Sequence, residues 1–171
     1  DETYIGGLEK NKHAGKRTPF AQGRSPKVKM PVVGMIERGG EIRAQVVERV
    51  TMATVENQVK ENVSKGAKLF TDDFLSYARL GRSFEHKSVS HSKGEYCRDG
   101  IHTNTIESFW ALFKRGYHGV YHHMSKKHLQ RYVNEFTFRF NRRANEMQNV
   151  FSEVVTNITE SSKLPYKELI A

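Results

Sequence analysis

The chain has 171 residues, 37% of them hydrophobic and 27% charged, which is typical of a single globular domain with a real core. No apolar run approaches the roughly 18 residues of a membrane span and nothing resembles a signal peptide, so we expect no membrane partner. The single cysteine, Cys97, excludes an internal disulfide and a cysteine-based zinc site and favours a reducing, intracellular setting.

The charge is more informative than the composition. Twenty-eight Lys and Arg residues against nineteen Asp and Glu residues leave a net charge of +9. The excess gathers in two blocks, residues 9–31 and residues 98–143, and five histidines are interleaved in the second block. Segregated basic blocks of this kind are typical of a protein that binds a polyanion. Charge alone also allows a basic surface that is simply solvated.

Five β-rich runs bounded by turn residues predict strands. They lie at residues 1–6, 28–38, 41–50, 67–73 and 84–91. Gly39-Gly40, between the second and third runs, is a hairpin signal. Residues 8–27 are rich in Lys, Gly and Pro without any period, so they predict a basic loop.

Apolar residues at helical spacing predict helices, with a short helical turn at residues 74–80. The helices lie at residues 51–64, 102–115, 125–143 and 146–159. Ser125 is the expected N-cap of the third helix. The second helix, HTNTIESFWALFKR, has the apolar stripe of a helix packed on a core, formed by Ile106, Phe109, Trp110 and Phe113.

This order of elements predicts an α/β fold with a mixed five-stranded sheet and helices on both faces. It fits a ribonuclease-H-like fold, although several α/β folds begin in the same way. We expect residues 1–171 to form one domain. Because the chain begins at Asp1 rather than at a methionine, we expect it to be a fragment of a longer protein.

Three acids stand on segments that such a fold brings to one edge of its sheet. They are Asp1 on the first strand, Asp72 at the end of the fourth strand and Glu107 on the second helix. Carboxylate oxygens hold magnesium-type ions, and two such ions about 4 Å apart can activate a water and stabilise the leaving oxygen of a phosphodiester. Spacing alone leaves alternatives, because Asp73 competes with Asp72, either acid can cap the next turn, and Glu107 can form a surface ion pair.

Lys114 follows Glu107 by seven residues, so the two side chains are about 20° apart around the helix and about 10 Å apart along it. They share a face but are too distant for an i, i+4 ion pair. Lys114 can therefore contact a DNA phosphate, or it can be a solvated lysine whose stem covers Trp110 or Phe113. His102 and the pair His122-His123 are candidates for general bases or zinc ligands. Phosphate contact or packing explains these histidines better, since two-metal chemistry needs no histidine base.

Several motifs together resemble the catalytic domain of bacterial DDE-type insertion-sequence transposases, in the branch related to the eukaryotic Merlin elements. The motifs are DETYIGG, EKNKH, VVGMIER, TDDFLSY and the segment at residues 102–143, HTNTIESFWALFKRGYHGVYHHMSKKHLQRYVNEFTFRFNRR. The last segment is highly specific, whereas the dipeptide TD alone carries little information. The similarity extends from Asp1 to about Arg143.

The resemblance implies a DDEK site in which the three acids of the family correspond to Asp1, Asp72 and Glu107 and its basic residue to Lys114. These acids would hold two Mg²⁺ or Mn²⁺ ions. The family often has glycine after the second acid, where this chain has Asp73. Some relatives use an asparagine as the third ligand, which makes Asn104 a minor competitor.

The implied function is metal-dependent hydrolysis at transposon ends followed by strand transfer of the freed 3′ hydroxyl into target DNA. The partners would be double-stranded DNA and further copies of the chain, in the cytoplasm and associated with the nucleoid. The loop at residues 8–31 would hold the DNA backbone together with Lys114, Arg115, Lys126, Lys127, Arg131 and Arg139. Proteins of this kind also carry an N-terminal DNA-reading module, which we do not find in this sequence. The alternatives are a nuclease that cuts without joining and a domesticated, catalytically silent DNA-binding domain.

Overall fold

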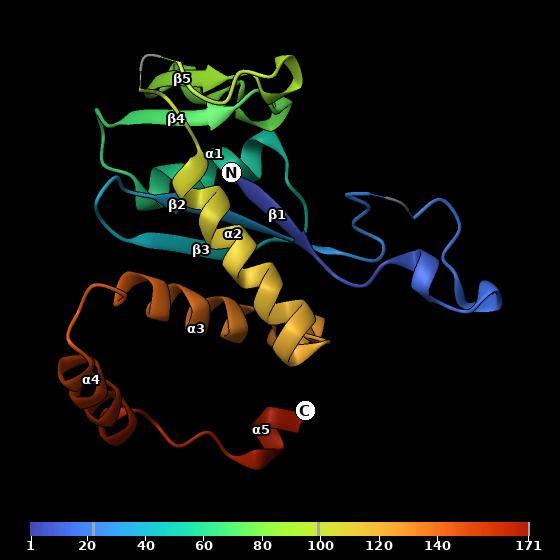
Figure 1. Ribbon diagram of the computed structural model, residues 1–171, viewed down its shortest axis with the longest axis vertical. Coiled ribbons are helices and arrows are strands. Elements are labelled where there is room, and N and C mark those ends of the chain that lie inside the picture. The colour runs from blue at the N-terminus through green and yellow to red at the C-terminus, as the bar shows by residue number, and fades with distance from the viewer. Residues whose placement is uncertain (22, 99, 171) are drawn as a thin grey trace.

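The computed structural model describes residues 1–21, 23–98 and 100–170, and these residues form two separate sheets (Figure 1). The first sheet is antiparallel, with strand order β1-β2-β3. The second sheet pairs β4 with β5 in parallel. The strands are β1 (Glu2–Ile5), β2 (Met30–Ile36), β3 (Ile42–Val46), β4 (Lys68–Asp72) and β5 (Glu85–Val89).

Five α-helices accompany the sheets in the described part of the chain, and none of them is long and apolar enough to cross a membrane. They are α1 (Met52–Asn62), α2 (Asn104–Gly116), α3 (Leu129–Asn141), α4 (Met147–Glu160) and α5 (Tyr166–Ile170). A π-helical turn, Tyr117–Tyr121, continues α2.

The predicted elements are present, with shifted ends. The helix expected from Ser125 begins at Leu129, because residues 126–128 form a 3-10 turn in which the His128 amide donates to the Ser125 carbonyl. The side chain of Ser125 makes no capping hydrogen bond there, so that N-cap prediction is wrong. By contrast, Thr51 caps α1 by accepting from the Thr54 amide at 3.1 Å.

The prediction of one five-stranded sheet is not confirmed, because the described strands split into three and two. A cavity of about 730 Å³ is lined by residues of β2, β4 and α1. Strands β2 and β4 therefore border the same space with their side chains, while backbone hydrogen bonds link strands only within each sheet. The ribonuclease-H-like fold stays a prediction.

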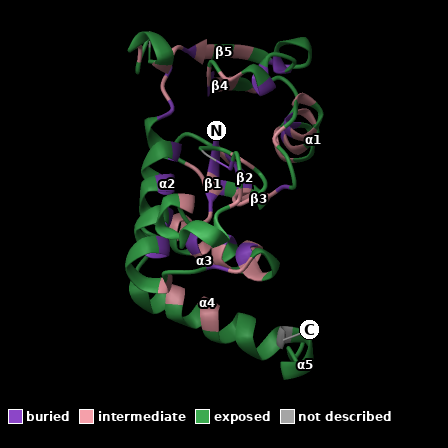
Figure 2. Ribbon diagram, turned by 90° about the vertical axis from the view of Figure 1, so that its right-hand side faces the viewer, coloured by how far each residue is buried: buried purple, intermediate pink, exposed green. Residues whose placement is uncertain are grey.

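The side chains of β2 alternate between two cores. Val32 and Ile36 pack in the larger core with the aromatic residues of α2 and α3, whereas Met35 packs in the smaller core with Val55 and Val59 of α1. Helices α1 and α2 accordingly lie on opposite sides of the first sheet (Figure 2). This alternation follows from the two-residue period of a strand.

The close approach of α2 to the first sheet depends on Gly34 in β2. A Cβ atom at this position would lie 2.5 Å from Cζ2 and 2.8 Å from Cη2 of the Trp110 ring. Trp110 is 4% exposed and Phe109 and Phe113 are fully buried, so the predicted apolar stripe of α2 is the face that packs on the sheet.

Substitution of Gly34 by Ala should destabilise the fold. The added methyl overlaps the Trp110 ring, and overpacking of a core typically costs about 1–3 kcal/mol. Gly7→Ala is the matched control, since a Cβ there meets no heavy atom within 4 Å. Urea denaturation of both variants measures the difference. Equal free energies of unfolding for Gly34→Ala and wild type would contradict the packing described here.

Candidate functional site

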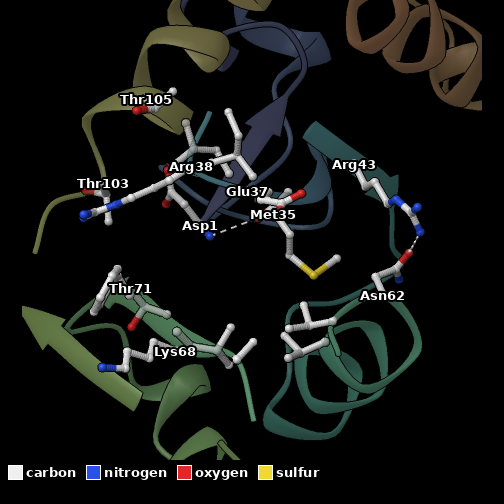
Figure 3. A pocket seen from close by; sticks show the side chains of 18 of the residues that line it. Asp1, Met35, Glu37, Arg38, Arg43, Asn62, Lys68, Thr71, Thr103 and Thr105 are labelled. Atoms are coloured by element: carbon white, nitrogen blue, oxygen red, sulfur yellow. Dashed lines mark hydrogen bonds between the residues drawn. The ribbon is translucent and has the colours of Figure 1, made fainter. Parts of the chain in front are cut away.

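The cavity between the sheets has Asp1 on its wall. The N-terminal residue lies between the two sheets in both views of the chain (Figures 1 and 2). The Asp1 carbonyl accepts from the Gly34 amide at 2.9 Å, which extends the β1–β2 ladder by one residue. Asp1, Thr71 and Thr103 come from three different segments around the same space (Figure 3).

Asp72 is the last residue of β4 and is half-buried. Its Oδ1 accepts from the Phe74 amide at 3.1 Å, so it caps the turn that follows the strand. Burial lowers the pKa of the Asp1 amino group, and the carboxylates of Glu2 and Asp72 oppose this shift. The Asp72 carboxylate therefore lies close enough to act on the Asp1 amino group. The structure thus brings Asp1 and Asp72 toward the same region.

Asp73, the competitor of Asp72, is occupied elsewhere. Its Oδ2 accepts from the hydroxyls of Ser92 and Ser90, each at 2.7 Å. These two hydrogen bonds lower the pKa of Asp73. The neighbouring acids thus have different partners, because Asp72 binds the backbone of its own turn and Asp73 binds the segment after β5.

Glu107 lies in the first turn of α2 and its side chain is 44% exposed. Its Oε1 accepts from the Thr103 hydroxyl at 2.6 Å and is 3.6 Å from Nε2 of His91. A surface ion pair is therefore available to Glu107 with His91, when His91 is protonated, rather than with a lysine one turn away. Thr103 also lines the cavity, so the Glu107 carboxylate is held next to its rim.

Carboxylate oxygens are ligands that suit magnesium or manganese. The described residues, however, do not assemble a complete metal site. No three Asp, Glu, His or Cys side chains among them are grouped so as to hold an ion. Asp1 and Asp72 approach the same region, while Glu107 is held by Thr103. The three candidate histidines form no such group in the described chain either: His102, His122 and His123.

The cations predicted to bind DNA are exposed on α2, on the turn before α3 and on α3. They are Lys114, Arg115, Lys126, Lys127, Arg131 and Arg139. Arg139 is partly neutralised by Glu135, whose Oε1 is 2.6 Å from its guanidinium. Lys114 has a pKa below the ordinary value of a lysine. Partial burial lowers that pKa, and the charges of Lys29 and Arg24 lower it further.

Sequence reasoning missed a buried network beside Asp1. Glu2 has a side chain only 1% exposed, and its Oε1 accepts from Arg24 at 2.9 Å while its Oε2 accepts from the Tyr77 hydroxyl at 2.6 Å. The guanidinium of Arg24 also lies over the rings of Phe74 and Tyr4, 5.1 and 5.8 Å from their centroids. The available signal was Glu2 itself, an acid within a short predicted strand. If such a side chain is buried, it needs a charged or hydrogen-bonding partner.

Comparison with known proteins gives three matches. The model of the ISXO2-like transposase domain family matches residues 1–141. An uncharacterized protein in transposable element ISH50 of Halobacterium salinarum is 27% identical over 148 residues, which are 81% of this chain and 50% of that protein. An uncharacterized transposase-like protein of Haemophilus influenzae is 32% identical over 97 residues, 56% of this chain and 77% of that protein. The chain thus spans about half the length of the Halobacterium relative. No solved structure matches.

Removal of the Tyr77 hydroxyl should weaken the fold through Glu2. Tyr77→Phe keeps the buried ring but leaves one oxygen of a buried carboxylate without its donor, and such a loss typically costs about 1–3 kcal/mol. Tyr96→Phe is the matched control, because Tyr96 is 62% exposed. Urea denaturation should show a lower free energy of unfolding for Tyr77→Phe only. If both variants match wild type, the network contributes nothing to stability.

Proposed function

Because the chain belongs to the family of ISXO2-like transposase domains, we propose that it is the catalytic domain of an insertion-sequence transposase. It would hydrolyse a phosphodiester at the end of the element and join the freed 3′ hydroxyl to target DNA. The relation to Merlin elements, the ribonuclease-H-like fold and the assembly of several copies on DNA belong to the same proposal. The observation that supports it most is that Asp1, on the cavity wall, lies near enough to Asp72 of the second sheet for the Asp72 carboxylate to raise the pKa of the Asp1 amino group.

Asp1, Asp72 and Glu107 would hold two Mg²⁺ or Mn²⁺ ions. When bound, such ions supply Lewis-acid activation of the attacking water or hydroxyl and stabilise the leaving oxygen. The chain itself supplies the positions of the ligands. Strand β2 fixes the backbone of Asp1 through Gly34, the turn after β4 fixes Asp72 through the Phe74 amide, and Thr103 fixes the Glu107 carboxylate.

Lys114 would orient the DNA strand rather than take part in bond breaking. A lysine stem on a helix leans toward the helix N-terminus, which here is the end that carries Glu107. Its ammonium can then contact a phosphate close to the reacting one. Double-stranded DNA is the proposed partner, and the remaining exposed cations would contact its backbone without reading sequence.

Two variants separate the neighbouring acids. Asp72→Asn should lower cleavage by at least about a hundredfold, because changes to groups that merely support metal ligands already cost about 10–100-fold. Asp73→Asn should cleave nearly as fast as wild type, since an amide oxygen can still accept from Ser90 and Ser92. The assay is cleavage of a plasmid carrying the ends of the element, in Mg²⁺ or Mn²⁺. Loss in Asp73→Asn with full activity in Asp72→Asn would reverse the assignment.

Product analysis on labelled DNA ends separates the proposed transposase from its two alternatives. In Mg²⁺ or Mn²⁺, a labelled 3′ end should appear covalently joined to an unlabelled target plasmid. Ca²⁺ should bind without supporting turnover, because its larger and looser coordination misplaces the reacting oxygens. Cleavage without joined product would indicate a nuclease, and DNA binding with neither product a silent domain. Activity with Zn²⁺ alone would contradict the proposed metal.

A further inference from the structure

We infer that Arg24, Lys29 and Lys114 form a binding site for one phosphodiester group of a DNA strand beside Asp1, and that buried Glu2 holds Arg24 in this site. The inference rests on the proposed function and adds to it a specific phosphate site that joins the basic loop, α2 and the residue before β2.

The first step is the fixed position of Arg24. Its guanidinium is anchored to the buried Glu2 carboxylate and lies over two aromatic rings, although its side chain is 59% exposed. Arginine carries five N–H donors in a planar fork, and the contact with Glu2 uses a single nitrogen, Nη1. Among the described residues its other nitrogens make no hydrogen bond, and a fixed planar fork with unused donors suits the paired oxygens of a phosphate.

The second step is the convergence of the two lysines on the same place. Lys29 precedes Met30, the β2 residue that pairs with Ile5 of β1. Lys114 follows Phe113, which packs in the same core cluster as Ile5 and Met30. The charges of Lys29 and Arg24 both lower the pKa of Lys114, which agrees with this placement of the two cations near Lys114.

The third step is the missing countercharge. Glu2 offsets one of the three positive charges, and in the described part of the chain neither Lys29 nor Lys114 forms an ion pair with a carboxylate. Gathering like charges in this way costs energy unless an anion binds between them. A phosphodiester supplies that anion. Because the site lies next to Asp1, the phosphate bound there would be a neighbour of the phosphate that reacts.

The test is the salt dependence of DNA affinity for the full chain in EDTA, measured by fluorescence anisotropy with a short duplex. Each phosphate contact contributes about 0.9 to the slope of log K against log salt. Lys29→Ala should lower the slope by about this amount. Lys163→Ala is the matched control, because Lys163 is exposed and belongs to the segment between α4 and α5. That segment lies far from the first sheet (Figure 1).

Arg24 needs a paired substitution, because Arg24→Ala alone leaves a buried carboxylate without its partner and endangers folding. The double variant Glu2→Gln/Arg24→Ala removes both charges and should also lower the slope by about 0.9. As an independent readout, NMR titration of the Lys114 side chain should show a higher pKa in Lys29→Ala and in the double variant. A role in folding alone would not flatten the salt slope.

Unchanged slopes in Lys29→Ala and in the double variant would overturn the phosphate site, as would an equal loss in Lys163→Ala. Because these measurements need neither metal nor cleavage, they are separable from the proposed function. A wild-type chain that fails to cut in Mg²⁺ or Mn²⁺ refutes the transposase proposal, while the slope losses would still support the site. Cleavage by wild type with unchanged slopes refutes the phosphate site alone.

Discussion

The contact between Trp110 and Gly34 is the constraint on which the rest of the molecule depends. It fixes the distance between α2 and the first sheet, and α2 carries both Glu107 and Lys114. Buried Phe109 and Phe113 hold the same helix face against α3, where Phe113 meets Phe136 edge to face with ring centroids 5.0 Å apart. The proposed metal ligand and the proposed phosphate contact therefore stand on one rigid element, and any tilt of that element moves both.

A second constraint joins the segments that carry Asp1 and Asp72. Backbone hydrogen bonds link the described strands only within each sheet, so side chains make the connection between β1 and the turn after β4. Glu2 binds Tyr77 from that turn and Arg24 from the basic loop. The basic loop, predicted to be solvated or to bind DNA, is thus attached through its own Arg24 to β1, the strand that follows Asp1.

The sequence predicted what depends on local pattern and missed what depends on pairing. The stripe of α2 and the alternation of β2 follow from helical and strand periods, and both appear in the structure. Periodicity does not say which strands become neighbours, and for this reason the split into two sheets was not foreseen. Similarly, the spacing of Asp72 and Asp73 could not separate them, because their hydrogen-bond partners, Phe74 in one case and Ser90 and Ser92 in the other, are fixed by the fold.

Helix α4 has a different status from the helices that precede it. It contributes no buried residue, exposes Met147, Phe151 and Ile158, and is joined to the end of α3 by Arg142, which binds Glu153 at 2.5 and 2.8 Å. Segments with few buried apolar contacts open at lower free energy than core elements, so we expect the amides of α4 to exchange before those of α2 and α3. We therefore expect a stable body over residues 1–141, which the family model matches, followed by a helix that can open without unfolding that body.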